Sequence, residues 1–177
     1  MKLRSKSSII PLLVALLASL APMKRKMFVL GIIVFCFAVS GASAADVFSG
    51  NWKVNLAKSK YDPGPPPKGP NTGKIDAIEG GLKFTNDGVN AEGEPTHDEW
   101  SGKFDGKDNP VKGSQTRDTA ALTKIDNNTI VIISKKAGKV VSRTLTVFSD
   151  DGKTRTLTGV GTNAKGIATN NTVVYEK

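Results

Sequence analysis

Few residues of this chain have side chains suited to chemistry, and an arginine on a predicted strand is the most informative of them. Arg143 lies two residues from the apolar Val141 and Leu145, and Val147 continues the alternation. Side chains at every second position of a strand share one face, so we expect Arg143 to point inward with these neighbours. Burying an unpaired charge is costly, so Arg143 would need an acceptor there: a carbonyl, a carboxylate or a bound anion. A purely structural or edge-exposed role stays open.

Three more side chains complete the candidate lining of an interior cavity. Arg155 shares its predicted strand face with Lys153 and Leu157, which predicts a more exposed position than that of the first arginine. Tyr175 is expected to line the cavity or to pack with its hydroxyl group at the rim. Trp100 lies on a further predicted strand. The candidate ligand-contacting residues are therefore Arg143, Arg155, Tyr175 and Trp100.

Metal binding and catalysis have little support in the residue pattern. His97 is the chain's one histidine, and Asp98, Glu99, Glu92 and Glu94 lie close to it. A zinc site needs three or four ligands, and a hard cation needs several convergent oxygens. No nucleophile elbow, phosphate loop or His-Glu-x-x-His motif occurs. We therefore expect no metal, no cofactor and no enzymatic activity. An enzyme that uses this acidic stretch is a third, weaker hypothesis.

The N-terminal segment has the order of a secretory signal peptide. A basic run at Met23–Lys26 precedes an apolar core from Met27 to Val39, and small residues follow at Ala42-Ser43-Ala44. This order is typical of a leader that is cleaved after an A-x-A site. We expect residues 1–44 to be a leader region that is cleaved after Ala44. The mature protein would then work in the periplasm or outside the cell.

A second apolar stretch, from Ile9 to Ala21, precedes this leader. The simplest interpretation is that translation starts at Met23 and that the first 22 residues are not made. The alternatives are a membrane hairpin that tethers the protein and one long leader. Each apolar run is shorter than the roughly 20 residues of a spanning helix, so we expect no stable membrane span after cleavage.

The positive charge of the chain is concentrated in the leader. The whole chain carries 25 basic and 16 acidic residues, and residues 1–44 hold six of the basic and none of the acidic ones. The remaining 19 basic and 16 acidic residues leave a net charge of +3 for residues 45–177. Such a small, dispersed charge argues against a nucleic-acid partner. The one cysteine, Cys36, also lies in the leader, so the mature part can form no disulfide.

The rest of the sequence predicts short strands and one stiff connection. Phe48 to Leu56 alternates apolar residues with the period of a strand. Residues 61–70 are too rich in proline for a helix or a ladder and predict an extended connection. Gly80-Gly81 and Asn86-Asp87-Gly88 predict turns, and we expect an irregular stretch from Asp105 to about Thr116. Five strand-like segments follow: Thr119–Ile125, Thr129–Lys135, Lys139–Phe148, Lys153–Gly161 and Thr169–Glu176.

Short turns between these strands favour pairing of consecutive strands. Closure into a barrel would hide the free edges of such a sheet. We therefore predict an all-β fold in which residues 45–177 form a single domain. This domain would be an antiparallel up-and-down meander that closes into a barrel of roughly eight to ten strands. A β-sandwich is the alternative.

Both ends of the predicted domain resemble known barrel families. Phe48-Ser49-Gly50-Asn51-Trp52-Lys53 resembles the Gly-x-Trp start shared by lipocalins and fatty-acid-binding proteins, and Thr172–Lys177 is similar to the last strand of the latter. The chain also resembles uncharacterised, secreted, lipocalin-like bacterial proteins in the segments Phe104–Lys107 with Pro110-Val111, Asp150–Thr154 and Gly161–Gly166. The resemblance implies a lipocalin-like (calycin-type) barrel in which Gly50 and Trp52 are structural and Trp52 plugs the closed end.

Two departures from the fatty-acid-binding pattern concern the ligand. That pattern has an arginine two residues before the final tyrosine, where it helps to hold a carboxylate, and this chain has Val173 there. The proline-rich segment also stands where that family has a helix-turn-helix lid. The family's own way of holding a carboxylate therefore does not carry over to this chain.

The sequence leaves two function classes open. The first is an exported, non-catalytic barrel that binds a small, largely apolar ligand in its interior. The second is a ligand-free envelope structural or protein-interaction module whose barrel is filled by its own side chains. A protein partner of that module would contact the proline-rich segment or an outer face.

Overall fold

The computed structural model describes residues 46–163 and 165–177. The predicted leader, its cleavage site and the second apolar stretch lie outside these residues. Ten strands make up most of the described chain: β1 (Gly50–Val54), β2 (Thr72–Ile78), β3 (Gly81–Val89), β4 (Pro95–Lys103), β5 (Asp105–Pro110), β6 (Thr119–Lys124), β7 (Thr129–Lys136), β8 (Lys139–Phe148), β9 (Thr154–Thr162) and β10 (Ala168–Glu176). A short 3-10 helix, η1 (Leu56–Lys58), follows β1.

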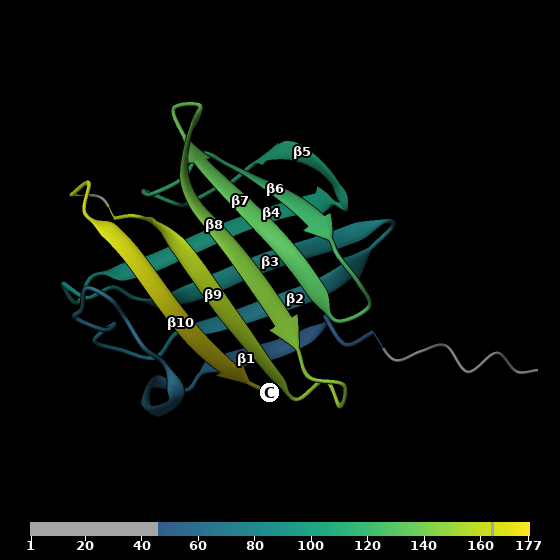
Figure 1. Ribbon diagram of the computed structural model, residues 1–177, viewed down its shortest axis with the longest axis horizontal. Coiled ribbons are helices and arrows are strands. Elements are labelled where there is room, and N and C mark those ends of the chain that lie inside the picture. Colours follow the sequence, from purple (N-terminus) through teal and green to yellow (C-terminus); the bar gives the residue numbers. More distant parts are fainter. Residues whose placement is uncertain (1–45, 164) are drawn as a thin grey trace, which may run out of the picture. The chain divides into compact units, whose positions relative to one another are not determined.

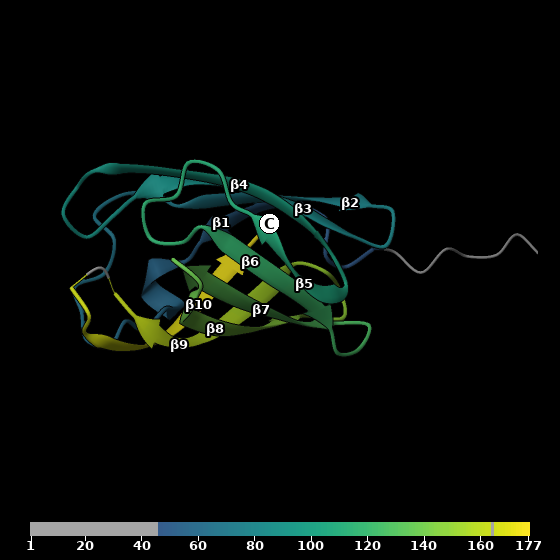
Figure 2. The same ribbon diagram turned by 90° about the horizontal axis from the view of Figure 1, so that it is seen from above.

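All ten strands belong to one antiparallel sheet. Its order is β4-β3-β2-β1-β10-β9-β8-β7-β6-β5, so all consecutive strands except β4 and β5 pair, and β1 also pairs with β10. The sheet curls so that β1–β4 form one wall and β6–β10 cross them on the other side (Figure 1). Figure 2 shows the two walls edge-on. The predicted all-β, up-and-down fold is confirmed, and the barrel is nearly closed.

The seam of the barrel lies between the two ends of the sheet, β4 and β5. Outside the continuous ladders, the backbones of Glu99 and Lys112 bond to each other in both directions, at 2.9 and 2.8 Å. This single antiparallel bridge joins β4 to the segment after β5. The strand β5 itself occupies part of the stretch that the sequence predicted to be irregular, because its backbone pairs with β6.

One predicted turn is wrong. Asn86-Asp87-Gly88 lies inside β3, which pairs on both sides with β2 and β4. Only glycine fits at position 88, because a Cβ atom there would lie only 1.5 Å from the side-chain oxygen of Asn71. That oxygen also accepts a hydrogen bond from the backbone of Val89. Tertiary pairing therefore overrides the local turn signal.

Aromatic side chains fill one end of the barrel, which we call the plug. Trp52 and Phe148 are each 1% exposed and pack edge to face at 5.5 Å, and Phe48 packs against Phe148 at 5.0 Å. The indole Nε1 of Trp52 donates to the carbonyl oxygen of Phe48. Gly50 has a φ of +139°, which side chains other than glycine rarely adopt. These positions agree with the structural roles expected for Gly50 and Trp52.

The proline-rich segment runs along the rim of the opposite, open end. The backbone of Asp62 bonds to β10 residue Asn170, and the backbone N–H of Lys68 donates to Asn90 in the β3–β4 turn. The segment thus borders the open end between the start of β10 and the end of β3. In the part of the chain that the structure describes, we find no helix long and apolar enough to cross a bilayer.

Candidate ligand-binding cavity

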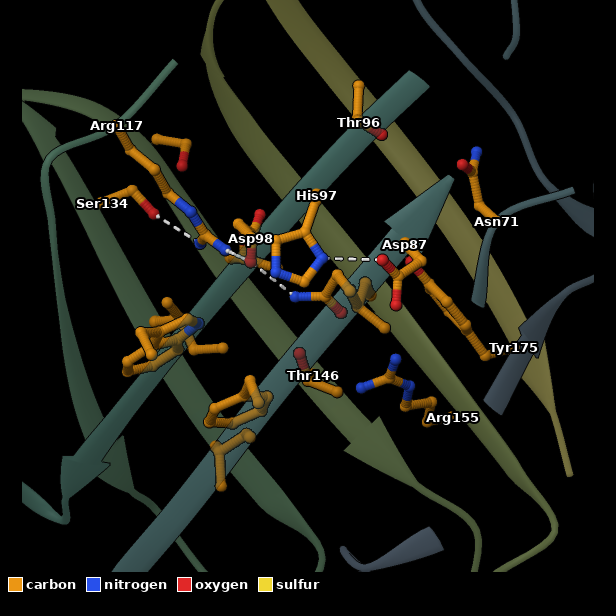
Figure 3. A pocket seen from close by; sticks show the side chains of 18 residues that line it. Asn71, Asp87, Thr96, His97, Asp98, Arg117, Ser134, Thr146, Arg155 and Tyr175 are labelled. Atoms are coloured by element: carbon orange, nitrogen blue, oxygen red, sulfur yellow. Dashed lines mark hydrogen bonds and ion pairs between the residues drawn. The ribbon is translucent and has the colours of Figure 1, made fainter. Parts of the chain in front are cut away.

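A cavity of about 300 Å³ lies inside the barrel, between the plug and the open end. Its lining mixes apolar rings with hydroxyl, amide and charged groups (Figure 3). The charged groups come from two different walls. Asp98 on β4 and Arg117 in the β5–β6 connection lie on the side of the seam, and Arg155 lies on β9.

The seam side of the cavity carries a paired charge. The guanidinium Nη2 of Arg117 donates to Oδ1 of Asp98 at 2.9 Å, and its Nη1 donates to the hydroxyl of Ser134 at 3.2 Å. The same Asp98 oxygen accepts from the amide of Asn86 at 2.8 Å. The Arg117 and Asp98 side chains are only 19% and 20% exposed. Each charge therefore has an opposite charge and neutral hydrogen-bond partners, and this network ties the β5–β6 connection to β3, β4 and β7.

Two aromatic rings on β3 and β4 form the apolar wall beside this network. Phe84 and Trp100 stack with centroids 4.5 Å apart and planes 8° from parallel. The guanidinium of Arg117 lies 5.8 Å from the Trp100 ring. Trp100, predicted from sequence to line the cavity, does so.

The opposite wall carries a buried arginine without an acceptor. Arg155 is 4% exposed, and its Nε has no hydrogen-bond partner in the described chain. None of the ion pairs found among the described residues involves it. Its guanidinium lies 4.1 Å from the ring of Tyr175 and 5.2 Å from that of Trp52. Burial lowers the pKa of Arg155 to about 10, so the group is still charged at neutral pH.

The fold makes room for Arg155 at Gly73. A Cβ atom at Gly73 would lie 2.7 Å from the Arg155 Nη2 and 2.9 Å from the side-chain oxygen of Asn86. The guanidinium therefore reaches across the barrel from β9 to β2, above the Trp52 ring of the plug. A second buried polar atom, Oγ1 of Thr146 on β8, also has no partner in the described chain. Thr146 and Arg155 face the cavity from adjacent strands.

The orientations predicted for the two arginines are the reverse of those in the structure. Arg143 is exposed on the outer face, where Leu145 and Val147 are 43% and 45% exposed, so its predicted inward orientation is wrong. The inner face of β8 carries the hydroxyl residues Ser142, Thr144 and Thr146 instead. The apolar outer residues of β8 gave the misleading signal, and a shift of one residue reverses every side chain of a strand. Arg155, predicted to be more exposed, is buried.

Tyr175 lines the cavity as predicted and is partly buried against the plug. Burial raises the pKa of its phenol above the usual value. Sequence reasoning missed Arg117, Asn86 and Thr146, and it considered Asp98 only as part of the acidic stretch beside His97. The available signal was the alternation of serine and threonine along β8, which marks the wet inner face of a barrel.

The histidine of the acidic stretch lies at the mouth of the cavity. His97 and Asp87 are 53% and 62% exposed at the mouth of the cavity, with Nδ1 and Oδ1 2.7 Å apart. This hydrogen bond raises the pKa of His97. Within residues 46–163 and 165–177, no three metal-ligating side chains cluster.

Comparison with known proteins gives the chain no family. It matches no family model, and no curated protein matches its sequence. The ten-stranded, up-and-down antiparallel barrel is compatible with a lipocalin- or calycin-like fold.

Proposed function

We propose that this protein is a non-catalytic barrel that binds a small molecule in its interior and holds an anionic group of that molecule at Arg155. The observation that carries the proposal is the unpaired charge of Arg155, which is 4% exposed beside a cavity. Proteins rarely bury an unpaired charge, because doing so costs several kcal/mol. An anionic ligand would supply the missing acceptor.

The two arginines of the cavity differ in their pairing. Arg117 pairs with Asp98, and the carboxylate of Asp87 at the mouth bonds to His97. Among the described residues, the buried guanidinium of Arg155 has no carboxylate partner, although the lining as a whole holds two arginines and two aspartates. A carboxylate matches this single guanidinium in charge and can accept two of its N–H groups.

The size and lining of the cavity narrow the ligand further. A volume of about 300 Å³ is at the small end of the range for ligand sites. The aromatic plug fills the apolar end of the barrel, which leaves no room for a long acyl chain. The polar lining therefore favours a small, polar ligand over the largely apolar one expected from the sequence. From its leader sequence, we place the protein in the periplasm or outside the cell.

Isothermal titration of the protein, expressed from the full chain, tests this proposal. The probes are D-glucuronate and hexanoate, with D-glucose and 1-hexanol as uncharged counterparts. At least one acid should bind more tightly than its counterpart. The variant Arg155→Gln should lose roughly ten- to a hundredfold in affinity, as expected for removal of a hydrogen-bonded charge. Arg143→Gln, on the outer face of the neighbouring strand, is the matched control. Equal affinity in Arg155→Gln and the unchanged protein would refute the proposal.

A protein-interaction module is the second candidate, and one observation favours it. Leu145, Val147 and Val160 are 43–50% exposed on the outer faces of β8 and β9. A partner could cover this apolar surface. Pull-down from the envelope fraction with the triple variant Leu145→Thr, Val147→Thr and Val160→Thr tests this candidate. A partner profile unchanged by these substitutions would exclude this surface, and a variant without residues 61–70 tests the proline-rich segment in the same way.

A further inference from the structure

A row of hydroxyl side chains lines the cavity along β8. Ser142, Thr144 and Thr146 occupy alternate positions of the strand and face the interior. Thr146, at the end of the row nearest Arg155 in the strand register, is 1% exposed and its Oγ1 has no partner in the described chain. A buried hydroxyl without a partner destabilises the fold unless a ligand bonds to it. The row thus begins on the strand next to that of Arg155 and runs toward the open end.

The neighbouring strand leaves this row uncovered. Gly159 and Gly161 of β9 pair with Thr144 and Ser142 and have no side chains to fill the space in front of them. A Cβ atom at Gly159 would lie 3.2 Å from Oγ1 of Thr144. Gly159 therefore keeps the hydroxyl group of Thr144 accessible from the cavity, where an alanine would crowd it.

Acceptors and donors also face the cavity from the other wall. Both side-chain hydrogen bonds found for Asp98 use its Oδ1 atom. In the described part of the chain, Oδ2 of Asp98 thus stays available to accept a hydrogen bond. On the same wall as β8, Ser134 of β7 pairs directly with Ser142 across the ladder and adds a fourth hydroxyl to the lining.

We infer that the ligand is a small hydroxylated carboxylate, a compound of the sugar-acid or polyhydroxy-acid class. Its carboxylate would bind Arg155, and its hydroxyl groups would bond to Thr146, Thr144 and Ser142, and to Asp98 on the other wall. This inference rests on the proposed function and adds the substrate class. A purely apolar acid would bury these hydroxyl groups without partners, and sites built to bond a ligand hydroxyl reject analogues that lack it.

Six-carbon probes that differ in one feature test the inference. Isothermal titration compares hexanoate, which has the carboxylate alone, with D-glucuronate, D-galacturonate and D-gluconate, which add hydroxyl groups. D-glucose has the hydroxyl groups without the carboxylate. At least one hydroxylated acid should bind tenfold or more tightly than hexanoate and than D-glucose.

A conservative variant separates the hydroxyl row from the arginine. Thr144→Val keeps the shape and removes one hydroxyl, so it should weaken the hydroxylated acid about threefold to tenfold and leave hexanoate unchanged or tighter. Thr158→Val, on the exposed outer face of β9, is the matched control and should change neither. Circular dichroism confirms that both variants fold.

The outcomes distinguish the two proposals. If hexanoate binds as tightly as every hydroxylated acid, the inference is wrong and the anion-binding function stands. If D-glucose binds as tightly as the acids, or if no acid binds, both are wrong. A Thr144→Val variant that weakens hexanoate and the hydroxylated acid equally would also contradict the inference.

Discussion

The two cationic side chains that enter the barrel from opposite walls are in opposite electrostatic situations. Arg117, near the seam, bonds to Asp98 and Ser134, and its charge is compensated within the protein. Arg155, on the continuous wall of β8–β10, contacts two aromatic rings and no carboxylate in the described chain. Figure 3 shows both side chains: dashed lines join Arg117 to its partners, and none is drawn from Arg155.

The difference in pairing suggests different roles for the two arginines: Arg117 stabilises the fold, and Arg155 binds a ligand. The Arg117–Asp98 pair closes a network across the one place where the barrel has a single backbone bridge, so we assign it to stability. Arg155 gains roughly 1–2 kcal/mol from its contacts with Tyr175 and Trp52. Its lowered pKa corresponds to an opposing burial cost on the order of 3 kcal/mol. The protein thus keeps at Arg155 a charge that costs stability, as functional sites often do.

The largest expected effect is on stability at the seam. Arg117→Met should lower the free energy of unfolding by about 2–3 kcal/mol, because it leaves the largely buried Asp98 carboxylate without its cation. Chemical denaturation measures this loss. The double variant with Asp98→Asn should recover part of it, since no charge then remains unpaired. If Arg117→Met left the free energy of unfolding unchanged, the stabilising role assigned to the Arg117–Asp98 pair would be wrong.

A smaller effect of opposite sign is expected on the other wall. Arg155→Met should leave the free energy of unfolding unchanged or raise it by about 1 kcal/mol, because it removes a desolvated charge and retains an apolar stem against Trp52 and Tyr175. The same denaturation experiment provides the measurement. A loss of unfolding free energy as large as that of Arg117→Met would mean that Arg155 has an acceptor within the protein and is not a ligand-binding group.

The smallest expected effect is the response of binding to pH between 6 and 8. The pKa of Arg155 is lowered to about 10, so the group stays protonated throughout this interval and D-glucuronate affinity should change less than about twofold. Affinity should fall above pH 10, as the guanidinium loses its proton, and a bound carboxylate would delay that fall by stabilising the charged form.

Titration calorimetry across this range also distinguishes His97 as a rival anion receptor. The hydrogen bond to Asp87 raises the pKa of His97, so its positive charge is present at low pH and is lost as the pH rises through that value. Binding at His97 would therefore weaken as the pH rises through this raised pKa, which lies above the ordinary histidine value of about 6.5. Such a decline would contradict the assignment of the anion to Arg155.

The sequence predicted the backbone of the barrel better than its interior. Alternation and turn residues located most strands, because those signals are local. Asn86-Asp87-Gly88 misled because its turn signal is overridden by pairing with two strands and by the Asn71 side chain. Register across the seam depends on distant residues and has no local signal.

Three of the four candidate residues, Tyr175, Trp100 and Arg155, line the cavity. Arg155 was expected to be the more exposed of the two arginines and is buried, whereas Arg143 lies on the outer face. The rule that apolar residues face inward fails for β8, whose inner face is polar and whose outer face carries Leu145 and Val147. The pairing of Arg117 with Asp98 joins a loop to a strand 19 residues away and could not be read from either segment.

The central claim, that Arg155 receives an anion, is tested most directly by the NMR signal of its own Nε–H group. The signal is assigned by comparison with Arg155→Gln and followed while D-glucuronate, D-galacturonate, D-gluconate or hexanoate is added. With at least one acid we predict a saturable downfield shift of this proton, as a carboxylate hydrogen bond forms, with the Arg117 and Arg143 signals nearly unchanged. An Arg155 signal that stays in place at saturating concentrations of all four acids would contradict the account.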